Sequence, residues 1–203
     1  LTGNYLKNKK QKSEFEQLAY KNIGSFFSEA EKAVQLLAGP QFQERLSYAK
    51  KTGELCHGSY NYHNIIFSNG NTAVTNFDKY KNECQISDLY QFMRKILEKY
   101  DWDIQTAYKM MEEYDKIKPV SDTERALLAA LFAFPEKFWK VMNYYFNSNK
   151  AWIPPKTKEK LEKVVQQNEK RQKFLEKAFD FPAFFRYNIH RTIMDWRALC
   201  CWI

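Results

Sequence analysis

The sequence predicts a mainly α-helical protein that carries one small β-hairpin. Apolar residues recur at spacings of three and four along most of the chain, which is the pattern of amphipathic helices. Residues 54–80 interrupt this pattern, because two short apolar runs there flank the Ser-Asn-Gly-Asn turn at 68–71, as in a β-hairpin. The sequence shows no alternation of strands with helices and no internal repeat that would indicate a larger sheet.

Two helices are expected before the hairpin. An apolar stripe from Phe15 to Leu37 predicts the first helix at residues 12–38. The Gly-Pro pair at 39–40 ends this helix, since proline cannot continue it and glycine favours a helix end. A shorter helix is predicted at residues 41–51.

Helix-start signals recur after the hairpin. Ser87 or Asp88 is a candidate N-cap, Asp103 opens the following helix, and Ser121 forms a capping box with Glu124. The helix that begins at Ser87 or Asp88 is expected to end at Tyr100, and the helix that Asp103 opens is expected to end before Pro119. Three more helices are expected at residues 125–134, 136–146 and 156–179. We therefore expect one domain over residues 1–179. The apolar tail at 180–203 either packs back on the helices or forms an exposed terminus.

Composition narrows the class of protein. The chain has 203 residues, of which 44% are hydrophobic and 28% charged, as in a globular protein. The net charge is +8, but the lysines are scattered over helix faces, which does not favour a nucleic-acid partner. The four cysteines form no CxxC pair, and no apolar run reaches the roughly 18 residues of a membrane span. We expect a cytoplasmic protein with no membrane partner, and the absence of an initial Met is compatible with a fragment.

The stretch after the second helix carries the spacing of a phosphoryl-transfer site. Ser59 and Asn64 lie five residues apart in one loop, and the hairpin returns the chain to Asn76 and Asp78. In such a site, a loop carboxylate orients the acceptor hydroxyl and an Asn five residues later holds a metal ion. A second carboxylate, placed after the hairpin, holds the metal that bridges the phosphates. The spacing therefore predicts the geometry of this site.

A family resemblance rests on these same residues. Residues 57–66, His-Gly-Ser-Tyr-Asn-Tyr-His-Asn-Ile-Ile, resemble the H-G-D-x-x-x-x-N-I-L loop of the aminoglycoside phosphotransferase and choline kinase superfamily. With Asn-Phe-Asp at 76–78 and Ser-Asp-Leu-Tyr-Gln-Phe-Met-Arg-Lys at 87–95, they more closely resemble its CotS-type spore-coat branch. That branch typically reads H-G-D-Y-H-Y-H-N, D-F-D and H-D-L-Y-R-F-L-R-K. The similarity extends over about residues 12–178.

The resemblance implies the C-terminal lobe of a protein-kinase-like fold. Such folds also carry an N-terminal β-lobe, with a loop that covers the phosphates and a lysine on a strand. Nothing before residue 54 has the pattern of a sheet, so we expect this lobe to be absent from the chain.

Two departures from the family motif bear on activity. Ser59 stands where the family has its catalytic Asp, and a hydroxyl cannot serve as a carboxylate base. Asn76 stands where the family has a metal-binding Asp, and its amide is a weaker ligand for Mg²⁺ than a carboxylate. Asn64 is retained, and Asp78 is the carboxylate that could replace Asn76 as a ligand. The sequence therefore predicts a degenerate Mg²⁺ site.

Three further residues are expected to hold the loop rather than react. The resemblance implies that His57 packs against the hairpin and that Asp88 binds backbone amides of the 57–64 loop, although a simple helix cap remains open for Asp88. Gly58 is expected to supply a tight turn.

Two functions follow from the resemblance. The first is a catalytically degenerate kinase-like protein that acts in spore-coat assembly or binding, in the mother-cell cytoplasm and the coat, with other coat proteins as partners. It needs no cofactor. The second is an ATP-dependent and Mg²⁺-dependent phosphotransferase for small-molecule hydroxyl groups, whose N-lobe lies upstream or on another chain.

Overall fold

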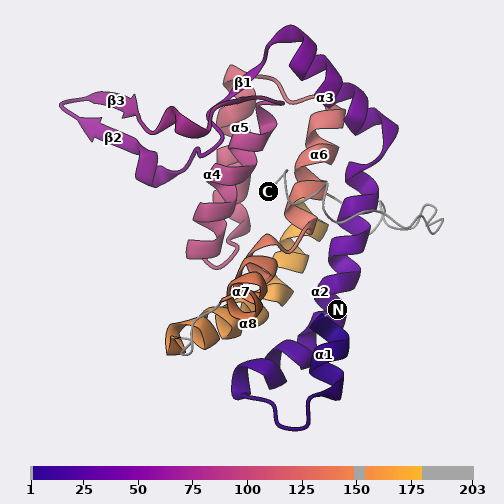
Figure 1. The fold of residues 1–203 in the computed structure, drawn as a ribbon. Helices are drawn as coiled ribbons and strands as arrows, with labels where there is room; N and C mark the ends of the chain where they lie inside the picture. The colour runs from indigo at the N-terminus through magenta and orange to yellow at the C-terminus, as the bar shows by residue number, and fades with distance from the viewer. Residues whose placement is uncertain (1, 149–153, 180–203) are drawn as a thin grey trace.

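The computed structural model describes residues 2–148 and 154–179, so the predicted tail at 180–203 lies outside the described residues. The helices are α1 (Thr2–Asn8), α2 (Glu14–Leu37), α3 (Pro40–Thr52), α4 (Ile86–Lys99), α5 (Ile104–Ile117), α6 (Asp122–Ala133), α7 (Glu136–Phe146) and α8 (Pro155–Phe179). The strands are β1 (Leu55–Cys56), β2 (Ile65–Ser68), β3 (Asn71–Val74) and β4 (Lys81–Asn82). Single 3₁₀ turns lie at Tyr62–Asn64 and Phe77–Lys79. The predicted class, mainly helical with a small hairpin, is confirmed (Figure 1).

The hairpin forms at the predicted turn. β2 and β3 pair antiparallel from Ile65 opposite Val74 to Ser68 opposite Asn71. Asn69 and Gly70 between them both have positive φ, as a two-residue hairpin turn requires. The prediction missed a second antiparallel ladder, between β1 and β4. Each of these strands has two residues, which is too short to show an alternating pattern.

Two of the predicted helix starts carry their capping side chains, and a third does not. Ser121 and Glu124 form the predicted capping box of α6, and the Asp103 side chain caps α5. The exception is α4, which begins at Ile86, so neither Ser87 nor Asp88 is its N-cap. The Asp88 carboxylate instead accepts hydrogen bonds from a distant loop.

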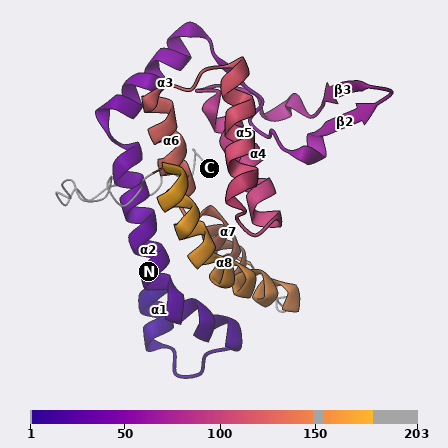
Figure 2. The same cartoon turned by 180° about the vertical axis from the view of Figure 1, so that it is seen from behind.

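Helix α6 lies at the centre of the helical body. It packs against α2, α3, α4 and α8, and the hairpin β2–β3 projects away from these helices (Figures 1 and 2). Three of its buried residues are large and apolar, and three are alanines that let neighbouring helices approach closely. They are Leu127, Leu128 and Phe132, with Ala129, Ala130 and Ala133. None of the helices in the described ranges has the length and hydropathy of a membrane-spanning segment.

A buried arginine closes the carboxyl end of α6. Arg171 on α8 is 6% exposed, and its Nη1 donates to the carbonyl oxygens of Phe132 and Ala133, both at 3.1 Å. These carbonyls belong to the last turn of α6, which has no intrahelical partner for them. The same guanidinium pairs with Glu29 on α2 and bonds Asn168, so one side chain ties three helices together.

Replacing Arg171 should therefore destabilise the fold strongly. Arg171→Ala leaves the two α6 carbonyls and the Glu29 carboxylate without their partner, and we expect a loss of about 3–5 kcal/mol. The exposed Lys173, which pairs with Glu169 on the same helix, is the control: Lys173→Ala should change stability by less than about 0.5 kcal/mol. Urea unfolding measures the stability of both variants, and equal losses would contradict the stabilising role of Arg171.

A second buried ion cluster joins α3 to α6. Arg45 lies 2.9 Å from Glu54 and 2.7 Å from Glu124. Burial by itself raises the pKa of Glu124, but hydrogen bonds from Arg45 and Ser121 outweigh it and hold the pKa below its usual value. The carboxylate is therefore the stable form of Glu124 in the folded protein.

This cluster gives the fold a specific dependence on pH. Because the pKa of Glu124 is depressed in the folded state, its contribution is complete above about pH 4.5 and disappears as the pH falls through the folded pKa. Glu124→Gln should lower stability at neutral pH by about 1–3 kcal/mol and make it less sensitive to acid. Unfolding free energies measured from neutral to acidic pH check this, with the exposed Glu176→Gln as control. An unchanged acid dependence in Glu124→Gln would contradict it.

Candidate functional site

The loop at residues 57–64 is held on helix α4 by one carboxylate. Asp88 accepts the backbone N–H of His57 through Oδ2 at 2.6 Å and the N–H of Gly58 through Oδ1 at 3.0 Å. Both bonds are charge-assisted, which makes them stronger than bonds between neutral groups. The loop and α4 are 30 residues apart in sequence at this contact, so the bond sets their relative position.

The His57 side chain braces the loop from inside. It is 7% exposed, and its Nδ1 accepts the N–H of Ser59 at 3.1 Å. Nδ1 is therefore unprotonated, so Nε2 carries the hydrogen and donates it to the Thr75 carbonyl at 2.8 Å. The ring also lies 4.5 Å from the Phe77 ring, centre to centre. With both nitrogens occupied by backbone groups, His57 connects the loop to the end of the hairpin and is not placed to act as a base.

Gly58 is required by a close backbone contact. Its φ is +72°, and a Cβ built there would lie 1.9 Å from the carbonyl oxygen of Lys79. No side chain fits in that space, so the turn brings the segment after the hairpin directly against the loop.

Amide groups join the two positions that the motif assigns to a metal. The Asn64 Nδ2 donates to the Ser59 carbonyl at 2.8 Å, which fixes the orientation of the Asn64 amide. Its Oδ1 then accepts a hydrogen from Asn76 Nδ2 at 2.7 Å. Asn64 is 8% exposed, and Asn76 has φ 63° and ψ 57°, a left-handed conformation that asparagine tolerates better than most residues. The oxygen of Asn64 that a metal would use therefore faces an N–H donor.

An open hollow of about 560 Å³ lies over these amides. Its lining comes from the loop, the segment after β3 and helix α4, and comprises Ser59, Asn61, His63, Asn64, Asn76, Phe77, Asp78, Lys79 and Lys95. Four of the residues singled out from sequence, at positions 59, 64, 76 and 78, thus share one surface. His57, Gly58 and Asp88 lie outside the lining, where they hold the loop. Lys79 and Lys95 were not predicted from the sequence, because neither stands at a motif position that the family uses for the phosphates or the metal.

The residues of the hollow do not fit a Mg²⁺ site. Mg²⁺ prefers carboxylate and phosphate oxygens, and Asp78 is the one carboxylate among the lining residues. Two lysines share the hollow with it, and they oppose a cation. Among the described residues, no group of three or more His, Cys, Asp or Glu side chains is arranged to hold a metal ion.

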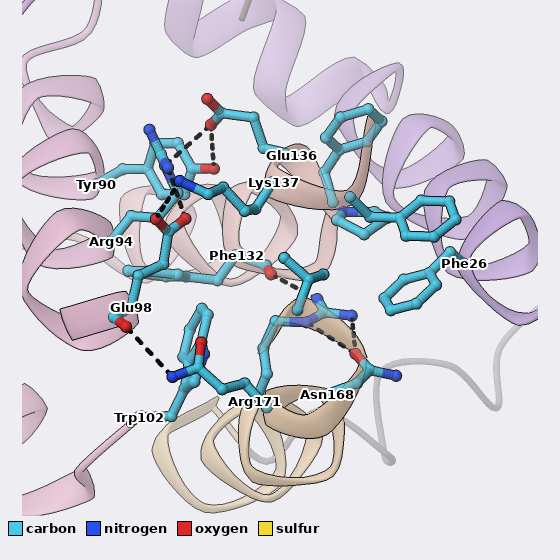
Figure 3. A pocket seen from close by; sticks show the side chains of 15 residues that line it. Phe26, Tyr90, Arg94, Glu98, Trp102, Phe132, Glu136, Lys137, Asn168 and Arg171 are labelled. Atoms are coloured by element: carbon cyan, nitrogen blue, oxygen red, sulfur yellow. Dashed lines mark hydrogen bonds and ion pairs between the residues drawn. The ribbon is translucent and has the colours of Figure 1, made fainter. Parts of the chain in front are cut away.

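A smaller cavity of about 40 Å³ lies deep between α4, α6, α7 and α8 (Figure 3). On one side of it, Glu136 accepts the Tyr90 hydroxyl at 2.8 Å and lies 3.0 Å from Arg94 Nε. Arg94 also bonds Glu98 at 2.7 Å. A space of this size holds about one water molecule, so the cavity belongs to the packed core and is not a ligand site.

The structure allows a matched test of the loop geometry. Gly58→Ala forces a Cβ against the Lys79 carbonyl, and we expect a loss of at least about 3 kcal/mol, since the backbone has to move. Gly70 in the hairpin turn has a similar φ of +78° but open space around it, so Gly70→Ala should cost only about 1–2 kcal/mol. Urea unfolding compares the two, and equal costs would show that the contact with Lys79 is not tight.

Comparison with known proteins supports the fold described above. The chain is similar to Spore coat protein S of Bacillus subtilis (strain 168), with 19% identity over 165 residues, which are 80% of this chain and 47% of that protein. A solved aminoglycoside phosphotransferase from Alicyclobacillus acidocaldarius superposes with a TM-score of 0.80 at 20% identity, over 87% of this chain and 53% of that one. The chain thus spans about half the length of these relatives, and the expected aminoglycoside phosphotransferase-like fold is confirmed. The family model described as "Spore coat putative kinase YutH" matches residues 4–178, and the chain belongs to this family.

Proposed function

We propose that this chain is a catalytically degenerate kinase-like protein that acts in the spore coat by binding or assembly. The observation that carries the proposal is the hydrogen bond from Asn76 to Asn64, which occupies the oxygen a metal would need. Ser59 adds to it, because general-base assistance by a carboxylate is worth roughly 10²–10⁴ in rate and a serine hydroxyl does not supply it. The partners proposed are other spore-coat proteins, and the proposed locations are the mother-cell cytoplasm and the coat.

The residues that hold the loop in place differ from those at the reactive positions of the motif. The Asp88 carboxylate and the His57 imidazole hold the loop by bonding to backbone groups of residues 57, 58 and 75. Since none of these contacts uses a metal or a nucleotide, the loop keeps its shape when the carboxylates at positions 59 and 76 are replaced by neutral side chains. Retention of the loop is therefore compatible with a role as a folded binding surface.

An active phosphotransferase is the second candidate, and one observation favours it. Asp78 lines the same hollow as Asn64 and makes no ion pair within the described residues, so its carboxylate is free to accept a ligand. Positioning and electrostatics supply most of the catalysis in phosphoryl transfer. This candidate requires ATP, Mg²⁺ and an N-lobe outside this chain.

Restoring the two carboxylates tests the proposal. In the Ser59→Asp/Asn76→Asp double variant, the new carboxylate at position 76 faces the Asn64 oxygen, and this repulsion is relieved by a cation. We expect Mg²⁺ to raise the unfolding temperature of the double variant, by an amount equivalent to about 2.7 kcal/mol at a hundredfold excess over Kd. The original chain should show no such rise with Mg²⁺.

Asn61→Asp is the matched control. It adds a negative charge to the same hollow, but its side chain bonds His63 and Ser59 rather than Asn64. Mg²⁺ should therefore stabilise this variant less than the double variant. Transfer of the ATP γ-phosphate by the original chain, or stabilisation by ATP that requires Mg²⁺, would overturn the proposal and favour the phosphotransferase.

A further inference from the structure

Loss of the two carboxylates changes the charge of the hollow as well as its ligands. Two lysines, Lys79 and Lys95, face it with one carboxylate, Asp78, so its formal charge is positive when His63 is neutral. A cation-binding site has the opposite balance. An anion is therefore the ligand that the present side chains attract.

Lys95 is the residue of the hollow whose charge is least well compensated. It is half-buried on α4 and makes no ion pair within the described residues. Desolvation, and then the neighbouring Arg94, lower the pKa of its ammonium group. The charge of Glu98 raises this pKa, and Lys137 and Lys140 of α7 lower it, so the net shift is downward. A partly desolvated cation among other cations is costly unless an anion approaches it.

The carboxylates near Lys95 are already committed. Glu98 pairs with Arg94 at 2.7 Å and lies 3.5 Å from Lys137. Glu136 pairs with Arg94 at 3.0 Å and with Lys140. Both carboxylates form their ion pairs with other cations, so within the described residues no carboxylate pairs directly with Lys95.

The other donors around the hollow suit an oxyanion. The Ser59 hydroxyl makes no hydrogen bond within the described residues, since the three bonds of this residue use its backbone N–H once and its carbonyl twice. It shares the hollow with the ammonium groups of Lys79 and Lys95. A phosphate group has three peripheral oxygens and up to two charges near neutral pH, which matches two ammonium groups and a hydroxyl.

We propose that this hollow binds a phosphate group, free or as a monoester, without a metal ion. Lys95 and Lys79 supply the positive charge that Mg²⁺ supplies in an active kinase, and Ser59 donates a hydrogen bond. Asp78 lowers the affinity by repulsion. This inference rests on the proposed function, because it takes the hollow as a binding site that has lost phosphoryl transfer.

Titration of inorganic phosphate into the 203-residue chain, with EDTA present and the ionic strength held constant by chloride, tests it. Isothermal calorimetry should detect binding to the original chain. Lys95→Gln should weaken it about tenfold, as expected when a charged hydrogen bond is lost. Lys109→Gln removes the same charge from an exposed position on α5 and should leave the affinity unchanged. Asp78→Asn should strengthen binding several-fold, since it removes the repelling charge.

The outcomes distinguish this inference from the proposed function. No phosphate binding by the original chain, or equal weakening in Lys95→Gln and Lys109→Gln, overturns the phosphate site but leaves the proposed loss of catalysis standing. Binding that requires Mg²⁺ and disappears in Asp78→Asn overturns both, because Asp78 would then be a metal ligand. Acetate binding as tight as phosphate binding overturns the choice of phosphate over carboxylate. Retained thermal unfolding transitions in each variant confirm that the fold is intact.

Discussion

The two hydrogen bonds from the His57 and Gly58 amides to the Asp88 carboxylate position the rest of the loop. They attach the loop to the first turn of α4, a rigid helix of the packed body. Gly58 then passes against the Lys79 carbonyl, so the segment after the hairpin is placed by the same contact. Because His57 also bonds the Thr75 carbonyl, the loop, the hairpin and α4 form one connected unit.

This unit is independent of the chemistry at its surface. The contacts that hold it use backbone groups, the Asp88 carboxylate and the His57 imidazole, and neither of these side chains lines the hollow. The lining of the hollow includes Ser59, Asn64 and Asn76. A family framework can therefore persist while its reactive positions change. In the proposed function, neutral side chains at positions 59 and 76 weaken the attraction for a divalent cation, and the proposed phosphate site then depends on the two lysines of the hollow.

Helix α4 links the hollow to the core. Asp88 and Lys95 face the loop side, while Tyr90 and Arg94 face the buried cluster around Glu136 (Figure 3). Arg94 forms ion pairs with both nearby carboxylates, Glu98 and Glu136, and Lys95 makes no ion pair within the described residues. The ion pairs of the buried Arg94 therefore contribute to the positive charge of the hollow, because they engage the carboxylates near Lys95.

The sequence by itself determined the features that depend on neighbouring residues: the helical periodicity, the capping box at Ser121, the Asn-Gly turn of the hairpin and the spaced motif that identifies the family. These signals are local, because a helix face, a cap or a tight turn is formed by residues within a few positions of one another. Only the tertiary structure decided that Asp88 binds the loop and does not cap α4, that Asn76 bonds Asn64, and that Lys95 makes no ion pair within the described residues. Each of these depends on contacts between side chains of distant segments, and the spacing of residues along the sequence does not reveal such contacts.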